Sequence, residues 1–246
     1  MKNSFQVSDL IEKFDEITKK LDNDGIVIVR NVLDQEKIDQ ISQWWDSIRR
    51  PLRNGECIQG LKRYNHFYIH GVLPWPVGDI YKHNSIVSFM TNYLGQNLAL
   101  YMNRLNIKDF SFDSPIHLHQ DIPYFHGTDK KLTSFLALTD VNFNNGGMFF
   151  VKGSHKLGHL GKETLDINKF SEQDVFIPTL RAGDMLISDI HTIHASLTNI
   201  KKTDRLLLQV IYQPASDGAY YQDSIKEPTL VNGEWETELF EPWTHQ

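Results

Sequence analysis

Cysteine is almost absent from this chain, since Cys57 is the only one among its 246 residues. A single thiol cannot form an intrachain disulfide, which excludes the disulfide-rich folds of small secreted proteins. Cys57 is interpreted as an inert or partly exposed thiol rather than a nucleophile. Such low cysteine use suits a reducing compartment, so the expected location is the cytoplasm.

Long hydrophobic runs are also missing. No stretch reaches the roughly 18 consecutive apolar residues that mark a transmembrane helix, and the first residues contain no apolar signal core. The sequence therefore predicts neither a membrane-spanning protein nor one that is exported through a signal peptide.

The chain has no excess of basic residues, no internal repeat, no low-complexity segment and no evident linker. Its 25 Lys and Arg stand against 31 Asp and Glu, a formal net charge of −6, which gives no support for general nucleic-acid binding. A hydrophobic fraction of 40% is enough for a sizeable core. We expect one domain, residues 1–246, whose partner is a small molecule; the sequence does not determine the oligomeric state.

Helical patterns come first along the chain and strand patterns follow. Apolar residues at helical spacing predict one helix from Asp9 to Leu21 and another after Asp34, so residues 1–97 are expected to be a helical N-terminal part. From Leu98 onward, short β-rich runs alternate with Gly, Asn and Asp turns. This order predicts a mainly β fold with flanking α-helices: a double-stranded β-helix, the cupin-like jelly roll, with its core at 98–215 and a C-terminal cap at 216–246.

A histidine and a carboxylate occur two residues apart in His119-Gln120-Asp121. On a regular strand, residues i and i+2 point to the same side about 7 Å apart, so both side chains can reach one metal ion. His117 also lies two residues from His119 and would share that face. A His117/His119 pair, with Asp121 as a partner outside the metal's own ligands, is therefore an alternative assignment.

Two further histidines, His191 and His194, precede Arg205. Two imidazoles and one carboxylate can occupy one face of an Fe(II) ion and leave three positions open. An arginine nearby suits bidentate binding of a dicarboxylate cosubstrate. The apolar run after Arg205 predicts a β-hairpin that returns Arg205 alongside the residues just after His194, which favours His194 over His191 as the third ligand. The pattern indicates a metal-dependent oxygenase.

Several segments, in order and over most of the chain, resemble the phytanoyl-CoA dioxygenase-like family of Fe(II)/2-oxoglutarate oxygenases. Phe135 stands where that family usually has tryptophan, and Lys152 where it usually has proline. The matching segments are Asp24 to Leu33, His119-Gln120-Asp121 with Tyr124, Phe135 to Leu138, Asn145-Gly146-Gly147, Gly153-Ser154-His155-Lys156, Ala182-Gly183-Asp184, His194-Ala195-Ser196 and Arg205.

The resemblance implies Fe(II), 2-oxoglutarate as cosubstrate and O2, and it decides the ligands in favour of His119, Asp121 and His194. It places Arg205 and Ser196 on the distal carboxylate of 2-oxoglutarate; Lys108 would be another basic anchor. Gln120 and Phe135 carry over as lining of the cosubstrate pocket. The implied reaction is hydroxylation of an unactivated C–H bond, with no catalytic residue beyond the metal ligands.

The segment from Arg49 to Lys82 gathers basic and aromatic residues in an otherwise acidic chain. It is interpreted either as a solvated connecting loop or as a lid or substrate wall at the barrel mouth. On the second interpretation, Arg50, Arg53 and Arg63, together with Tyr124, are candidate substrate residues. They suggest a small metabolite with a carboxylate or phosphate.

Two other functional classes compete with the oxygenase. One is a ligand-binding jelly roll that has lost its metal, against which the complete ligand set counts. The other is a cupin-type metal enzyme that does not use 2-oxoglutarate, against which Arg205 and Ser196 count.

Overall fold

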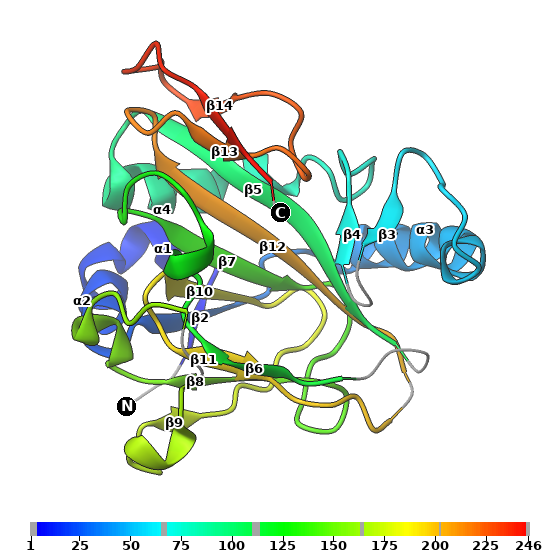
Figure 1. The fold of residues 1–246 in the computed structure, drawn as a ribbon, viewed down its shortest axis with the longest axis horizontal. Coiled ribbons are helices and arrows are strands. Elements are labelled where there is room, and N and C mark those ends of the chain that lie inside the picture. Colours follow the sequence, from blue (N-terminus) through cyan, green and yellow to red (C-terminus); the bar gives the residue numbers. More distant parts are fainter. Residues whose placement is uncertain (1–3, 65–67, 110–113, 163–164, 202, 245–246) are drawn as a thin grey trace.

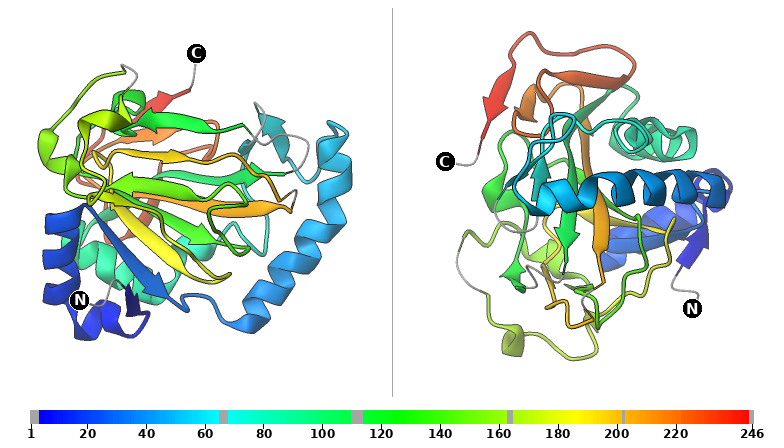
Figure 2. Two further views of the ribbon diagram at one scale, coloured as in Figure 1. Left: turned by 90° about the horizontal axis from the view of Figure 1, so that it is seen from below. Right: turned by 90° about the vertical axis from the view of Figure 1, so that its right-hand side faces the viewer.

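Two β-sheets face each other in the computed structural model, which describes residues 4–64, 68–109, 114–162, 165–201 and 203–244. Among these residues one sheet has nine strands, the facing sheet has four, and a further pair of strands lies near the C-terminus. Figures 1 and 2 show the two larger sheets as the layers of one sandwich, with the helices outside the nine-stranded sheet.

The nine-stranded sheet runs in the order β1-β2-β10-β7-β12-β5-β4-β3, and β14 also pairs with β5. Its longest strands, β5 and β12, are antiparallel neighbours at its centre. The strand bounds are β1 Ser4–Gln6, β2 Ile26–Arg30, β3 Lys62–Tyr64, β4 Tyr68–His70, β5 Leu98–Lys108, β7 Leu132–Ala137, β10 Met185–Asp189, β12 Arg205–Pro214 and β14 Thr229–Asn232.

The facing sheet has the order β6-β11-β8-β9, and the C-terminal pair consists of β13 and β15. Their bounds are β6 Ile116–His119, β8 Met148–Val151, β9 Val175–Phe176, β11 His194–Ser196, β13 Ala219–Tyr221 and β15 Glu241–Trp243. Short 3₁₀ turns connect several strands, at Ile80–Lys82, Ile122–Tyr124, Ser154–Leu157 and Ile167–Lys169.

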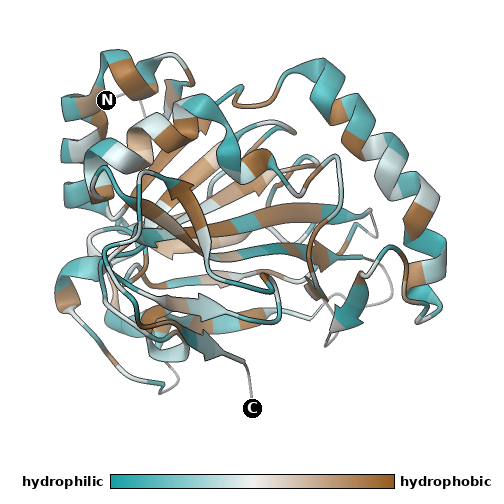
Figure 3. Cartoon of the chain, turned by 90° about the horizontal axis from the view of Figure 1, so that it is seen from above, coloured by the Kyte–Doolittle hydropathy of each residue, from teal (hydrophilic) through white to brown (hydrophobic). Residues whose placement is uncertain are grey.

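Four α-helices lie outside the large sheet, with α3 running across the ends of its strands (Figure 2): α1 Asp9–Glu12, α2 Phe14–Asp24, α3 Gln35–Arg53 and α4 Asn84–Leu94. The Asp34 carboxylate caps α3 by accepting a hydrogen bond from the Lys37 amide (2.8 Å). Figure 3 shows apolar and polar residues alternating along the helices, as expected for elements with one face on a sheet. Among the described residues, no helix is both long and apolar enough to cross a membrane.

The strand period of two decides what each face of the large sheet contacts. Along β12, Leu206 and Leu208 point outward into the core beneath the helices. Leu207, between them, points inward and packs with Phe135 and Phe150 in the core between the sheets. Arg205 and Gln209 share the inward face with Leu207, which places polar side chains inside the sandwich.

The jelly-roll expectation is confirmed, but two details of the predicted organisation differ. Residues 1–97 are not only helical, because β1 to β4 extend the large sheet, and the helix expected from Asp9 to Leu21 is interrupted at Lys13. The C-terminal segment likewise adds β14 to the edge of β5. Hydrophobic periodicity located the elements, but sheet membership depends on pairing partners that are distant in sequence.

The predicted hairpin between His194 and Arg205 does not form. β11 pairs with β6 and β8 in the small sheet, whereas β12 pairs with β5 and β7 in the large one. The intervening turn crosses from one sheet to the other. Arg205 therefore faces the residues after His194 across the interior of the sandwich instead of lying beside them in one sheet.

Gly25 joins α2 to β2 and lies against the turn that precedes His194. Its φ is +75°, and a Cβ there would lie 2.5 Å from both His155 Nδ1 and Thr192 Oγ1. The Thr192 hydroxyl donates to the Gly25 carbonyl (2.9 Å). The Asp24-Gly25 turn therefore packs against the Thr192 turn and helps to hold the backbone just before His194.

We predict that Gly25→Ala destabilises the protein more than Gly55→Ala does. Gly55 has a similar φ of +84°, but a Cβ added there would meet nothing within 4 Å. Gly55→Ala should cost about 1–2 kcal/mol for the left-handed backbone, and Gly25→Ala about 1–3 kcal/mol more for the collision with His155 and Thr192. Urea unfolding of both variants measures the difference; equal losses would show that the contact around Gly25 has no energetic weight.

Candidate metal and cosubstrate site

The antiparallel pairing of β6 with β11 places His119 directly opposite His194. Their ring centroids are 4.4 Å apart. Asp121 lies two residues beyond the end of β6, and ligand atoms of all three residues lie within 4.8 Å of one another. Among the described residues these are the only three His, Cys, Asp or Glu side chains grouped closely enough to hold a metal ion together.

A backbone carbonyl two residues earlier holds each imidazole ring in the same tautomer. His119 Nδ1 lies 2.7 Å from the His117 carbonyl, and His194 Nδ1 lies 3.0 Å from the Thr192 carbonyl. A carbonyl only accepts, so each Nδ1 carries the proton and each Nε2 presents its lone pair. Both Nε2 atoms face Asp121 Oδ1, at 3.5 and 3.8 Å, which gives a preorganised set of two nitrogens and one oxygen.

Asp121 reaches this position by a different route from the one expected. β6 ends at His119, and Asp121 begins the 3₁₀ turn Ile122–Tyr124. The two side chains therefore converge through a bend and not through the alternation of a regular strand. The other carboxylate oxygen, Oδ2, accepts a hydrogen bond from Gln209 Nε2 (3.2 Å). This bond leaves Oδ1 directed at the two histidines.

The ionisation of the three groups follows from burial and from their mutual charges. Burial and the neighbouring His119 lower the pKa of His194 to about 4, so its Nε2 lone pair is available at neutral pH. Burial alone would raise the pKa of Asp121, but the two histidines outweigh it and the pKa is lowered. Burial alone would lower the pKa of His119. The hydrogen bond and the charge of Asp121 outweigh this effect, so the pKa of His119 is raised. A metal ion and a proton compete for His119 Nε2, so a lower pH weakens metal binding at this residue.

The two alternative histidines lie elsewhere. His117 is exposed on β6, on the strand face opposite to Leu118, and only its carbonyl contacts His119. The ring of His191 lies between two carboxylates, with Nδ1 3.1 Å from Asp189 and Nε2 3.4 Å from Asp129. Neither ring belongs to the group of potential ligands.

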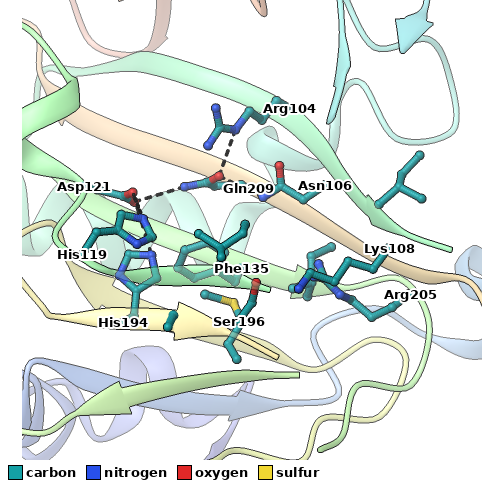
Figure 4. A pocket seen from close by; sticks show the side chains of 15 residues that line it. Arg104, Asn106, Lys108, His119, Asp121, Phe135, His194, Ser196, Arg205 and Gln209 are labelled. Carbon is teal, nitrogen blue, oxygen red and sulfur yellow. Dashed lines mark hydrogen bonds and ion pairs between the residues drawn. The ribbon is translucent and has the colours of Figure 1, made fainter. Parts of the chain in front are cut away.

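A basic cluster occupies the other end of the same pocket (Figure 4). Arg205 lies opposite Lys108 across β12 and β5, and both are buried. Ser196 faces them from the small sheet; its buried hydroxyl has no hydrogen-bond partner among the described residues. A buried hydroxyl without a partner is costly, and a ligand carboxylate held by the two cations would satisfy it.

Phe135 and Gln120 were both expected to line this pocket, and the structure separates them. Phe135 forms part of its wall, with its ring 5.8 Å from that of His194. Gln120 is buried behind the wall. Its amide donates to the carbonyls of Gly158 (2.8 Å) and His191 (2.7 Å), and its oxygen accepts from the Leu160 amide. Gln120 therefore holds two loops behind the histidines and does not face the cosubstrate.

Arg50, Arg53 and Arg63 do not line the pocket, which corrects their assignment to the substrate. Arg50 is exposed on α3. Arg53 bonds to Asp204 and lies 3.2 Å from Asp109, which also accepts from Arg63 at 3.4 Å. These carboxylates come directly before Arg205 and after Lys108. Burial of Asp109 explains the cations, because a buried carboxylate requires them as partners.

None of the described residues of the segment 49–82 lines the pocket that contains the metal group. The end of α3 is tied by ion pairs to the ends of β5 and β12, and β3 and β4 continue the large sheet beyond β5. Residues 65–67 of this segment lie outside the described part. Tyr124 also differs from expectation, since its half-buried ring is 6.0 Å from that of His119 but does not line the pocket.

Sequence reasoning missed three inward-facing polar residues on the two central strands: Arg104, Asn106 and Gln209. The Gln209 oxygen accepts hydrogen bonds from Arg104 Nε (3.0 Å) and Asn106 Nδ2 (2.9 Å). Polar residues at alternate positions of two otherwise apolar strands were a readable signal. All three residues line the same pocket as the metal group and the basic cluster.

Comparison with known proteins matches residues 21–206 to the family model described as phytanoyl-CoA dioxygenase (PhyH). A relative named "Probable alpha-ketoglutarate-dependent hypophosphite dioxygenase", from Stutzerimonas stutzeri, is 26% identical over 179 residues. That match covers 66% of this chain and 60% of the relative, so the chain spans less than two thirds of that protein.

An ectoine dioxygenase from Bordetella bronchiseptica is 22% identical over 222 residues, which is 78% of this chain and 72% of the relative. Among solved structures, the epimerase SnoN in complex with Fe³⁺, alpha-ketoglutarate and nogalamycin RO superimposes with a TM-score of 0.68. The match has 22% identity and covers 85% of this chain and 86% of that one, which shows a shared fold.

We predict that His119→Ala, Asp121→Ala and His194→Ala each sharply weaken Fe(II) binding. The reason is that their ligand atoms alone converge on one point among the described residues. His117→Ala and His191→Ala are the matched controls and should retain most of the affinity. Anaerobic equilibrium dialysis of Fe(II) measures all five variants; loss of iron in His117→Ala with retention in His119→Ala would reverse the ligand assignment.

Gln209→Leu should weaken Fe(II) affinity about 10- to 100-fold, because the outer hydrogen bond that orients the Asp121 carboxylate is lost. Gln213→Leu is the control. Gln213 is also buried on β12, but its amide donates to the carbonyls of Asp217 and Ala219 (both 2.7 Å). It should lose thermal stability and keep iron affinity. Equal iron affinities in the two variants would remove Gln209 from the site.

Proposed function

This chain belongs to the phytanoyl-CoA dioxygenase family, and on that premise we propose that it is an Fe(II)- and 2-oxoglutarate-dependent oxygenase that hydroxylates a C–H bond of a small metabolite. One observation carries the proposal. A single pocket combines the His119, Asp121 and His194 group with a separate anion site made by Arg205, Lys108 and Ser196.

The donor set suits Fe(II). Two imidazole nitrogens and one carboxylate oxygen on one side of an ion leave its other positions to exogenous ligands, and this ligand type is characteristic of non-haem iron oxygenases. In the proposed assignment, His119, Asp121 and His194 would hold the iron through Nε2, Oδ1 and Nε2, respectively. Gln209 restrains the carboxylate through Oδ2, which would leave Oδ1 for the metal.

The remaining pocket suits a dicarboxylate. Arg205 presents a planar fork to the distal carboxylate, Lys108 adds a second positive charge, and the Ser196 hydroxyl donates a hydrogen bond. Lys108 also donates to the Leu197 carbonyl, which holds its ammonium group at this end of the pocket. Gly146 permits this position, because a Cβ there would lie 2.6 Å from Lys108 Cδ.

Iron and 2-oxoglutarate, when bound, supply the oxidising chemistry, in which decarboxylation of 2-oxoglutarate is coupled to activation of O2. The protein positions and shields the reactants. Phe135, Met148 and Leu207 give the pocket an apolar lining. This lining excludes water from the cosubstrate and strengthens the charge interactions. No acid or base catalyst beyond the metal ligands is required.

We also propose that the protein works in the cytoplasm. Cys57 is a free, exposed thiol, and exposed unpaired thiols are best preserved in a reducing compartment.

Succinate release with Fe(II), ascorbate and 2-oxoglutarate tests the proposed activity. The oxygenase should form succinate slowly without a primary substrate, and His194→Ala should form none. A metal enzyme that does not use 2-oxoglutarate would bind iron without releasing succinate. A ligand-binding jelly roll would bind neither iron nor 2-oxoglutarate, and either result would refute the proposal.

Arg205→Ala should raise the 2-oxoglutarate concentration needed for half-maximal succinate release by about two to three orders of magnitude or more, with little change in iron affinity. An uncompensated carboxylate in a buried site costs about 3–5 kcal/mol. Arg205→Lys should restore only part of the loss, because an ammonium group lacks the planar fork. An unchanged cosubstrate requirement in Arg205→Ala would transfer the anchoring role to Lys108.

A further inference from the structure

The C-terminal segment contacts the turn that follows Asp121. The indole Nε1 of Trp243, in β15, donates a hydrogen bond to the Tyr124 carbonyl (3.1 Å). The same indole stacks on the ring of His126, with the two ring centroids 3.8 Å apart and their planes 18° from parallel. Trp243 therefore holds the end of the 3₁₀ turn Ile122–Tyr124 by one directional bond and one ring contact.

Tyr124 connects this contact to two of the proposed metal ligands. Its amide donates to the Asp121 carbonyl (3.0 Å), which closes the turn on the residue that supplies the carboxylate. Its ring lies edge-to-face against the ring of His119, with the centroids 6.0 Å apart. The backbone of Tyr124 is thus bonded to one ligand residue while its side chain contacts the other.

We propose that Trp243 is a positioning residue for the metal group, and that it acts through Tyr124 on Asp121 and His119. The inference rests on the proposed metal site. It gives a role to the tyrosine that follows the His119-Gln120-Asp121 motif. It also gives one to the C-terminal segment, which lies outside the residues matched to the family, 21–206.

The turn needs support from outside because its own hydrogen bonds are few. A 3₁₀ turn is held by i→i+3 bonds of poorer geometry than those of an α-helix. Here the amides of Tyr124 and Phe125 donate to the carbonyls of Asp121 and Ile122 (3.0 and 3.2 Å). His119 is fixed differently, by the pairing of β6 with β11. Asp121 lies beyond that pairing, so its backbone depends more on contacts from elsewhere.

The segment that carries Trp243 is itself fixed to the fold. β15 pairs in parallel with β13, in a register that matches Trp243 with Tyr221, and the Trp243 carbonyl accepts a hydrogen bond from the Gln222 amide (2.8 Å). Tyr221 is buried in one apolar cluster with Ile122 and Phe125, and Trp243 packs against this cluster. The turn is consequently held by the apolar cluster and by the indole together.

Metal binding is sensitive to this arrangement because Asp121 has to meet two histidines with one oxygen. If the turn adopts several conformations, only some of them place the carboxylate at the site, and the apparent metal affinity falls by that fraction. Loss of one hydrogen bond changes such a balance by about 2- to 10-fold. A purely structural side chain would instead lower the stability of the fold and leave the affinity of the folded protein unchanged.

Trp243→Phe tests the inference, because phenylalanine keeps an aromatic ring for the stack on His126 and lacks the N–H donor. The matched control is Trp235→Phe, since Trp235 lies in the same segment and packs edge-to-face on Phe240 (4.9 Å between ring centroids). Anaerobic dialysis with Fe(II), well below the unfolding temperature of each variant, should show affinity about 2- to 10-fold weaker in Trp243→Phe. Trp235→Phe should keep the wild-type affinity.

A spectroscopic readout and a second variant complete the test. Co(II), added in place of Fe(II), has visible absorption bands that depend on the geometry of its ligands. These bands should change in Trp243→Phe and stay unchanged in Trp235→Phe. Tyr124→Leu removes the ring beside His119 and should also weaken Fe(II) binding, which keeps the test available if Trp243→Phe does not fold.

Wild-type Fe(II) affinity in folded Trp243→Phe or in folded Tyr124→Leu overturns the inference. An equal loss of affinity in Trp235→Phe also overturns it, because a general loosening of the segment would then explain the effect. Failure of the wild type to bind Fe(II), or undiminished binding by His194→Ala, refutes the proposed metal site instead.

Discussion

The pairing of β6 with β11 is the constraint on which the site depends. It places His119 opposite His194, and directly opposed residues of an antiparallel pair have side chains close enough to share one ligand. A slip of one residue in this register would turn one of the two rings to the other face of the sheet. The position of the metal group is therefore set by backbone hydrogen bonds in the smaller sheet.

Much of the surrounding structure fixes that register. Ser154 accepts a hydrogen bond from the Ile193 amide (2.9 Å) and donates to the Val151 carbonyl (2.6 Å), which ties β8 to the start of β11. Gly25 packs against Thr192 on the other side, and Gln120 bonds to the His191 carbonyl from behind. Gly25, Gln120 and Ser154, which lie in the segments that resemble the family, thus hold the backbone that presents the histidines.

The opposite wall of the pocket has its own supporting structure. β5 and β12 bring Lys108 and Arg205 together, and Arg53 joins the neighbouring Asp109 and Asp204 to the end of α3. Asp184 similarly accepts from Arg30 and from the Asn31 and Arg181 amides, which fixes the turn before β10 to the end of β2. The buried carboxylates of Asp109 and Asp184 at these junctions form ion pairs with arginines from distant parts of the chain, as low-dielectric surroundings require.

The sequence by itself determined the jelly-roll class, the family resemblance and the residue types of the metal group, because strand periodicity and ordered motifs are local properties. Tertiary structure decided the rest. Gln120 turned away from the pocket, Arg53 and Arg63 became partners of a buried carboxylate, and Gln209 and Arg104 entered the site. Which groups face a cavity depends on strand pairing and on the neutralisation of buried charge, and both are interactions between residues that the linear sequence does not bring together.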